Sequence, residues 1–385
     1  MYSREKFLEV MNFETDKPVL KAEFAYWAGA IRNWLEQGLP KIKEVPGDMA
    51  ESEPLSGASP LSEEYSKKSE INVMKHLKLD SFLEKFPFDL SPQYRIETVS
   101  ETNEYKIYKD SFGITVKALK NKSGTPMALD YPIKNKKDFY NYILGYDEDF
   151  SKRLPKDFDA LAVKLKNREF PIRLGGNPFG FSFLARHLMG EVNYMLNMYD
   201  DPGLLKEFNE FYLDFVMKYW SGILNKIDVD CVFILEDIAY RSGSFISRDM
   251  FREFLTPYYV RFIDFLKQFK IKNIIVDCDG QIDELIPLWV KAGVTGIFPI
   301  EAVNDIEKIR DAYPRLALLG GFNKKVLFKD SGFKQIDIEL EKTGRLLRKG
   351  GYIPHIDHAV SEDVTWENFR YYRTRLNDIC DNAGG

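Results

Sequence analysis

Cysteine is scarce in this chain of 385 residues. The three cysteines, Cys231, Cys278 and Cys380, are odd in number, and no two of them form a C-x-x-C pair. This pattern disfavours both a disulfide framework and a structural zinc knuckle. It is typical of proteins that stay in a reducing compartment, so we expect a cytoplasmic protein.

Long apolar runs are absent as well, and nowhere do about 18 apolar residues stand together, which is the length of a membrane-spanning helix. The first residues, MYSREKFLEVMNFETDKP, are charged and contain no apolar segment of a signal peptide. We therefore expect neither export by that route nor a membrane span.

A surplus of positive charge is also missing. The formal net charge is -5, and the lysines and arginines are dispersed along the chain, which argues against a nucleic-acid-binding surface. A small-molecule substrate is the expected ligand, and the oligomeric state is left open. Since 44% of the residues are hydrophobic and 14% are aromatic, the chain can bury a large core as one large domain or two.

Short apolar runs alternate with amphipathic segments of helical length beyond residue 170. The runs span residues 171–177, 230–237, 273–280, 294–301, 316–323 and 351–358, and helical text fills 248–268, 282–291, 304–311 and 326–349. Strand–helix alternation of this kind favours a parallel sheet covered by helices. No G-x-G-x-x-G opens a helix after an early strand, and strands near residue 20 and within 77–88 bring the count to eight. The sequence therefore predicts an α/β fold, a (β/α)8 TIM barrel.

Two segments interrupt this pattern. Residues 41–70 are polar and rich in Pro, Gly and Ser, which predicts an irregular excursion in the N-terminal part of the chain. Residues 94–119 alternate Val, Ile, Thr and Tyr with polar residues, which predicts a small antiparallel β insertion of two or three strands. We expect residues 1–385 to form a single barrel domain that carries both segments.

Polar residues follow nearly every predicted barrel strand, where the chemistry of such barrels takes place. Asp277 and Asp279 leave their strand on the same side, whereas Cys278 faces the opposite way and is interpreted as a buried structural residue. A single acid after a strand more often caps the next helix than serves a function. The indication of a functional site is therefore that polar residues follow nearly all of the predicted strands. The polar candidates are Glu23, Asn177, Glu236, Asp237, Asp277, Asp279, Glu301, Asn323, Lys324, His355, Asp357 and His358.

Aromatic residues near the predicted mouth admit two interpretations. Tyr26, Trp27, Phe179, Phe181 and Tyr240 can contact an apolar or cationic part of a ligand, and core packing explains them equally well. His76 and His187 stand in predicted helices and are interpreted as structural.

Four segments carry a family resemblance: FPIRLGGNPFGFSFLARHLMG, DDPGLLKEFNEF, FILEDIAYRSGSFISRDMFREFLTPYYVRFI and GGYIPHIDHAVSEDVTWENFRYY. They are similar to segments of the uroporphyrinogen decarboxylase superfamily, which includes corrinoid-dependent methyltransferases. In the last of them, His358 takes the place of the histidine or cysteine of the motif G-H-G-I-x-P-x-T-P-x-E-N. The resemblance covers most of residues 170–376 and implies the TIM barrel.

The chain departs from both better-known branches of this superfamily. The decarboxylases have an arginine-rich segment after the first strand, whereas this chain has EFAYWAG, and Glu23 would repel an octacarboxylate tetrapyrrole. The thiol-methylating branch holds zinc with H-x-C and a later cysteine. Alignment on Gly280 puts Asp277, Asp279 and His358 at those positions, which implies oxygen and nitrogen ligands for zinc, manganese, magnesium or iron.

Three functions follow as hypotheses. The first is a methyltransferase that acts on a small methylated compound or a methyl-corrinoid, with Asp277, Asp279 and His358 holding a metal or acting as acid and base beside Asp237. The second is a decarboxylase or other lyase of a small carboxylate, which Lys324 or Lys325 would bind, or of a tetrapyrrole. The third is a non-catalytic ligand-binding barrel. The chain has no D-x-H-x-x-G segment, so any corrinoid is expected on a separate protein, and no bound organic cofactor is implied.

Overall fold

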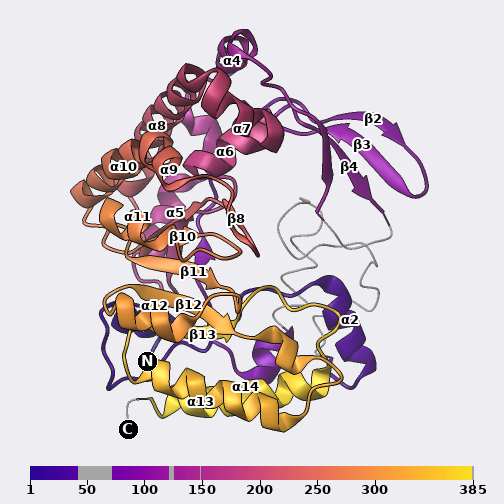
Figure 1. The fold of residues 1–385 in the computed structure, drawn as a ribbon, viewed down its shortest axis with the longest axis vertical. Coiled ribbons are helices and arrows are strands. Elements are labelled where there is room, and N and C mark those ends of the chain that lie inside the picture. The colour runs from indigo at the N-terminus through magenta and orange to yellow at the C-terminus, as the bar shows by residue number, and fades with distance from the viewer. Residues whose placement is uncertain (42–71, 121–124, 148, 384–385) are drawn as a thin grey trace.

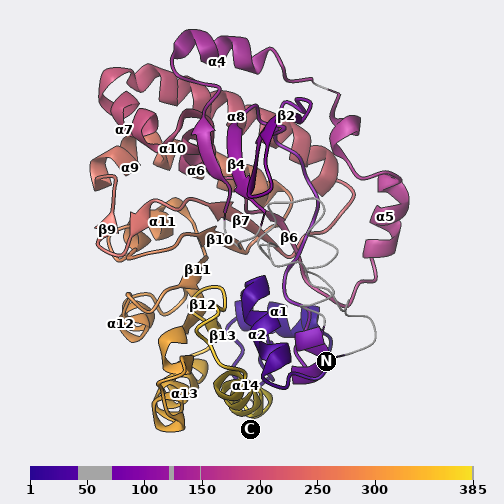
Figure 2. The same ribbon diagram turned by 90° about the vertical axis from the view of Figure 1, so that its right-hand side faces the viewer.

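A curved parallel sheet forms the centre of the computed structural model, which describes residues 1–41, 72–120, 125–147 and 149–383. Its seven strands are all parallel and follow the order β1-β6-β7-β10-β11-β12-β13 (Figures 1 and 2). The strands are β1 (Glu84–Lys85), β6 (Ile172–Gly175), β7 (Cys231–Leu235), β10 (Ile274–Asp277), β11 (Gly296–Ile300), β12 (Ala317–Phe322) and β13 (Tyr352–Ile356).

Apart from β1, whose two charged residues are exposed, these strands form because their apolar residues are buried on both faces of the sheet. All five residues of β7, β11 and β13 are buried, as expected for parallel strands covered by helices. Several covering helices begin at clear caps: Asp201, Asp305 and Thr365 each accept a hydrogen bond from a backbone N–H of the first turn. The covering helices are α8 (Pro202–Leu224), α10 (Thr256–Gln268), α11 (Ile286–Ala292), α12 (Ile306–Ala312), α13 (Phe333–Leu347) and α14 (Trp366–Asp381).

The strand predicted near residue 20 is not a regular strand, so the sheet has seven strands where eight were predicted. Residues 19–27 form one isolated bridge, between Tyr26 and Val360, and the carbonyl of Lys21 accepts a hydrogen bond from Asp80 N. The Glu23 carboxylate accepts from Ile356 N (3.2 Å), a backbone donor that a neighbouring strand would otherwise use. Scattered backbone hydrogen bonds and the Glu23 side chain thus take the place of a strand ladder here, and the described residues form no closed ring of paired strands.

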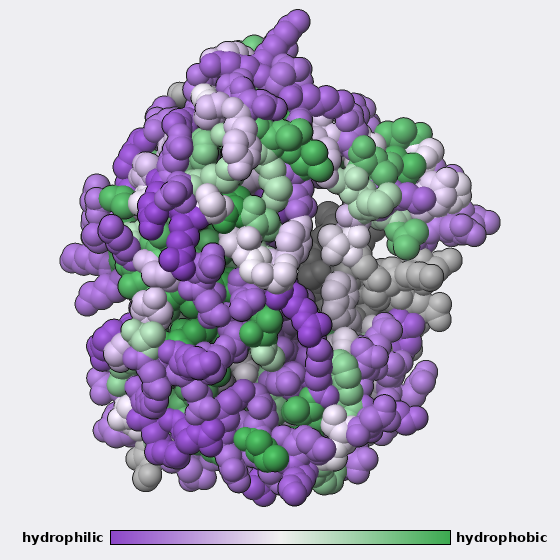
Figure 3. Space-filling view, in the orientation of Figure 1, coloured by the Kyte–Doolittle hydropathy of each residue, from purple (hydrophilic) through white to green (hydrophobic). Residues whose placement is uncertain are grey.

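The predicted antiparallel insertion contains four strands and extends beyond residue 119. β2 (Glu97–Glu101), β3 (Tyr105–Lys109), β4 (Thr115–Leu119) and β5 (Met127–Asp130) pair in sequence order. The fourth strand has the short sequence MALD, in which polar and apolar residues do not alternate, so the sequence did not predict a strand there. Figure 3 shows apolar surface over this sheet and near α7, where Val99, Met127, Val192 and Tyr199 are exposed.

The predicted excursion at 41–70 lies, apart from residue 41, outside the described residues. The helix predicted over 248–268 is divided into two helices at Leu255. The segment 326–349, which was also predicted to be helical, begins within a short 3-10 helix and continues into α13. None of the helices in the described ranges is long and apolar enough to cross a membrane. The remaining elements are α1 (Ser3–Met11), α2 (Ala28–Glu36), a helix over 72–77, α4 (Lys136–Ile143), η1 (Phe150–Arg153), α5 (Phe158–Leu165), α6 (Phe181–Met189), α7 (Glu191–Asp200), β8 (Ala239–Tyr240), β9 (Gly243–Ser244), α9 (Arg248–Phe254) and η2 (Lys324–Leu327).

Candidate functional site

Three side chains meet at the carboxyl ends of β10, β11 and β13. Asp279 and Glu301 follow β10 and β11 within two residues, and His358 follows β13. His358 Nε2 lies 3.2 Å from Asp279 Oδ2, and Glu301 Oε2 accepts a hydrogen bond from Gly280 N (3.0 Å). One ligand atom from each of Asp279, Glu301 and His358 lies within 4.8 Å of the other two. We call these three residues the triad.

Charges within the triad shift its protonation. Burial opposes protonation of His358, but the hydrogen bond and negative charge of Asp279 outweigh it and raise the pKa of the imidazole. Burial, followed by the charge of Asp279, raises the pKa of Glu301. Acids crowded together in this way repel one another unless a cation compensates. The imidazole of His358, when it is protonated, supplies one such positive charge.

The triad has the ligand types of a divalent-metal site. Two carboxylates and one imidazole provide oxygen and nitrogen donors, and three protein ligands leave a coordination position open, as in catalytic zinc sites. Bonds of about 2.1 Å in a tetrahedral site place the ligand atoms roughly 3.4 Å apart, so the observed spacing requires only small side-chain movements. The residues present therefore fit a metal ion.

The structure brings together Asp279 and His358, as the sequence predicted, but places Glu301 beside them where the sequence predicted Asp277. Asp277 still belongs to β10, whereas Asp279 lies two residues beyond it. Burial and the charges of Asp237 and Asp279 raise the pKa of Asp277, and the charge of Arg173 opposes this shift. Asp277 therefore lies in the same acidic cluster as the triad but outside the group of converging ligand atoms.

Arg173 is a charged residue of this region that sequence reasoning missed. Its guanidinium lies 4.9 Å from the centre of the Phe233 ring, and a Cβ on Gly176 would come within 2.3 Å of its Nη1. Burial lowers the pKa of Arg173, and the charge of Asp277 opposes this change. In the sequence, Arg173 is the single charged residue of the otherwise apolar segment PIRLGG. Because charged side chains are rarely buried without a partner, this position could have been recognised as part of a site.

Asp237 adjoins the triad from the end of β7. Its backbone is left-handed (φ 46°), and its Oδ1 accepts a long hydrogen bond from Asp279 N (3.5 Å). Burial and the charge of Asp279 raise the pKa of Asp237 to about 6. A carboxyl with this pKa can hold or release a proton near neutral pH, which is what a general acid or base requires.

The raised pKa predicts that Asp237→Asn stabilises the protein at pH 8, by about 1–2 kcal/mol. A carboxyl whose pKa is higher in the folded than in the unfolded chain favours folding while protonated, and this contribution is lost as the pH rises through about 6. Asparagine keeps the neutral form and tolerates the left-handed backbone. The gain should disappear below about pH 4, where Asp237 is protonated in both states. Urea unfolding at both pH values measures it, with exposed Asp228→Asn as the control; an equal gain at both pH values would contradict the prediction.

Two predicted site residues have structural partners that account for their burial. Glu236 accepts hydrogen bonds from Phe181 N (3.1 Å) and Ser182 N (2.8 Å) at the start of α6, and from Tyr259 Oη (2.8 Å). Burial raises the pKa of Glu236 to about 7. Glu23 is held by Arg373 Nη1 (2.9 Å) and by the Tyr372 hydroxyl (2.7 Å). Both acids therefore hold elements together, and neither is part of the triad.

None of the remaining predicted ligand-binding residues contributes an atom to the triad. Tyr26 and Phe179 are buried against other aromatic rings, Trp27 precedes α2, and Asn177 is exposed. Exposed Tyr240 donates a hydrogen bond to Glu191. Phe181 packs against Tyr259.

His355 is fully buried among Phe24, Phe82 and Phe298, and burial lowers its pKa to about 4. Cys278 is fully buried, and His76 and His187 pack against Trp366 and Phe112, respectively.

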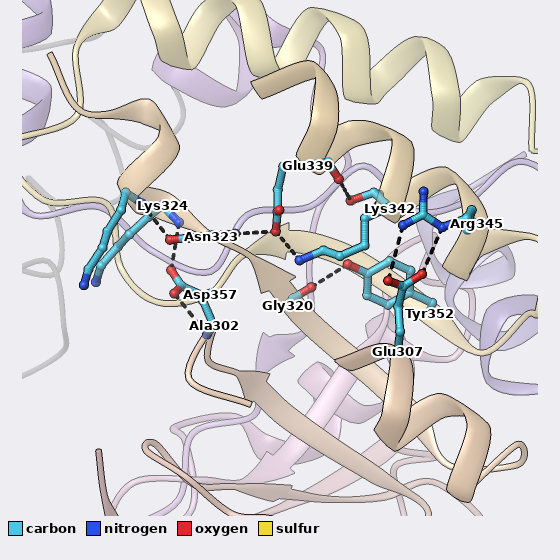
Figure 4. A network of polar contacts seen from close by, with 12 residues as sticks. Ala302, Glu307, Gly320, Asn323, Lys324, Glu339, Lys342, Arg345, Tyr352 and Asp357 are labelled. Atoms are coloured by element: carbon cyan, nitrogen blue, oxygen red, sulfur yellow. Dashed lines mark hydrogen bonds and ion pairs between the residues drawn. The ribbon is translucent and has the colours of Figure 1, made fainter. Parts of the chain in front are cut away.

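A polar network links the loops next to the triad (Figure 4). Asp357, which precedes His358, accepts hydrogen bonds from Ala302 N and Lys324 N, both at 3.2 Å. Asn323 N donates to Glu339 Oε1 (3.1 Å), and the Asn323 side chain caps η2 through Lys325 N (3.1 Å). The predicted ligand residues Asn323 and Lys324 thus shape the rim, Asn323 through its backbone and side chain and Lys324 through its backbone.

Comparisons with known proteins agree with this architecture. The family described as "Uroporphyrinogen decarboxylase (URO-D)" matches residues 105–377, which is more than half of the chain. A solved methyltransferase from Methanosarcina mazei has a similar fold, with a TM-score of 0.63 and 14% sequence identity over 98% of this chain and 99% of that one. No curated protein matches the sequence. The chain belongs to the uroporphyrinogen decarboxylase family.

Proposed function

We propose that this protein is a methyltransferase that moves a methyl group between a small methylated compound or methyl-corrinoid and an acceptor bound above the strand ends. The observation that carries the proposal is the convergence of Asp279, Glu301 and His358 on one point at that edge of the sheet. The similarity in fold to a methyltransferase supports it.

In this proposal the triad holds one divalent metal ion. When bound, the metal supplies a Lewis acid that lowers the pKa of an acceptor group. The chain's own residues orient the reactants: the two carboxylates of the triad neutralise the metal charge, and His358 completes the ligand set. Asp237, with its pKa of about 6, can take up the proton that an acceptor loses. A corrinoid, where one takes part, arrives on a separate protein.

Metal analysis and a transfer assay test this function together. Protein purified without chelator should contain one equivalent of zinc, manganese or iron. It should also demethylate methylcobalamin in the presence of a small thiol, which is followed by the change in visible absorption. Chelator treatment should abolish the transfer, and added metal should restore it. The proposal would be refuted if the protein contained no metal and transferred no methyl group from free or protein-bound methyl-corrinoid. Binding of the methyl-corrinoid without any turnover would favour a non-catalytic barrel.

A second candidate, a carbon–carbon lyase acting on a small carboxylate, is supported by the proton-transfer capacity of Asp237. Its raised pKa suits a group that protonates a carbanion at neutral pH. The positive charge of Lys324, near Asp357, is available for the substrate carboxylate. In a lyase, chelator-treated protein would remain active, and Asp237→Asn would lower kcat more than it raises KM. Metal-dependent activity would favour the methyltransferase.

We predict that the purified protein does not decarboxylate uroporphyrinogen at a useful rate. The segment EFAYWAG contains no arginine that could bind the substrate's carboxylates. Its Glu23 forms a buried ion pair with Arg373. The acids of the triad region would repel a polyanion. Product analysis beside an authentic decarboxylase checks this expectation, and comparable turnover of the two proteins would show that it is wrong.

A further inference from the structure

One buried carboxylate joins the loops that follow β11, β12 and β13. Asp357 Oδ2 accepts the hydrogen bond from Ala302 N, and Oδ1 accepts the one from Lys324 N. Ala302 directly follows Glu301, and Asp357 directly precedes His358. The side chain of Asp357 therefore connects the backbone beside one triad residue to the backbone beside another (Figure 4).

The middle loop of this connection is itself fixed from the opposite side. Asn323 N donates to Glu339 Oε1 on α13, and Lys342 forms an ion pair with the same carboxylate. Asp357 N also donates to the carbonyl of Phe322 (2.8 Å). The loop that contains Lys324 is therefore anchored on α13, and Asp357 is bonded to that loop (Figure 4). Because Asp357 is held in this way, its bond to Ala302 N restrains the loop that contains Glu301.

The contacts of Asp357 require a carboxylate. The residue is 8% exposed, and its two oxygens receive two backbone N–H groups from different loops. Asparagine has the same shape but only one acceptor oxygen, so its NH2 group would face one of the two backbone donors. Replacement by asparagine should therefore release one loop while keeping the volume of the side chain.

We propose that Asp357 is a positioning residue that sets the spacing between Glu301 and His358 so that both reach one metal ion. The inference rests on the proposed metal-binding function of the triad. Groups that orient metal ligands without touching the metal typically change affinity by about 10–100-fold when they are removed. Asp357 holds the ligand-bearing backbone in the same indirect way, and an error in ligand position weakens a site directly.

Titration of chelator-treated protein with Zn²⁺ or Co²⁺ alone tests the role of Asp357. Asp357→Asn should bind both ions about 10–100-fold more weakly than wild type. Its cobalt complex should have a changed visible absorption spectrum, because altered ligand positions change the coordination geometry. Asp363→Asn is the matched control, since Asp363 is an exposed acid of the same loop. It should bind and absorb as wild type does.

Thermal melts of the metal-free proteins separate positioning from unfolding, and Asp357→Asn should melt within a few degrees of wild type. If Asp357→Asn does not fold, Asp357→Glu replaces it; its longer side chain should move the loops apart and weaken binding. A folded variant with the wild-type affinity and cobalt spectrum would overturn the inference while leaving the proposed function intact. If wild type itself binds neither ion, the proposed function fails and the inference fails with it.

Discussion

Replacing Asp279 by asparagine should reduce the affinity for a divalent metal at least about 100-fold, while the free energy of unfolding stays equal or rises. Asp279 provides one of three converging ligand atoms and half of the carboxylate charge of the triad. Loss of a direct ligand should exceed the effect of removing an orienting group. Stability should not fall, because the charge of Asp279 raises the pKa of Asp237, Asp277 and Glu301, and relief of this repulsion should offset the weakened contact with His358.

Calorimetric titration with Zn²⁺ and urea unfolding of the metal-free protein measure the two effects on the same sample. Asp283→Asn is the matched control, because Asp283 is an exposed acid only four residues away. Glu301→Gln should reproduce the loss of affinity. Asp277→Asn should have a smaller effect, since Asp277 is not part of the triad. Wild-type affinity in Asp279→Asn, with only a lowered melting temperature, would require the site assignment to be abandoned.

Replacing Arg373 by methionine should destabilise the fold by about 3–5 kcal/mol, the usual cost of leaving one charge of a buried ion pair alone. Arg373 is fully buried and donates to Glu23 Oε1 and to the carbonyl of Ala22. Burial raises the pKa of Glu23, and Arg373 opposes this rise. Without Arg373 the carboxyl should take up a proton in the folded state.

The loss of stability in Arg373→Met should depend on pH in a defined direction. A carboxyl with a higher pKa in the folded than in the unfolded chain favours folding while protonated and loses that contribution as the pH rises. The deficit should therefore be smallest near pH 4 and largest above pH 7. Urea unfolding across this range measures it. Exposed Arg375→Met on the same helix should change little, and a pH-independent deficit would contradict the proposed cause.

The sequence predicts the parallel strands of the second half well because each is a continuous apolar run buried on both faces. It fails at residues 19–27, where apolar text led us to expect a strand. The contact that replaces strand pairing there is made by the side chain of Glu23, which joins residues far apart in the chain. No local pattern reports such a contact.

The candidate site was predicted in part for a similar reason. Alternation along β10 predicts that Asp277 and Asp279 leave the strand on the same side, but it does not say how far each side chain stands beyond the strand end. Only the three-dimensional arrangement shows that Glu301 reaches the position beside Asp279 and His358. For Phe179 and Tyr26 the sequence left ligand contact and core packing open, because proximity to a strand end does not distinguish the two, and both residues are buried in the structure.

The buried pair of Glu23 and Arg373 also bears on the order in which the chain can fold. Its two residues are separated by 350 positions, so Glu23 acquires its partner only after α14 has been synthesised. Domains dominated by such distant contacts fold slowly, because a long loop must close before the contact forms. We therefore expect the Glu23 carboxylate to stay hydrated in the growing chain and to be buried only after α14 is available to pair with it.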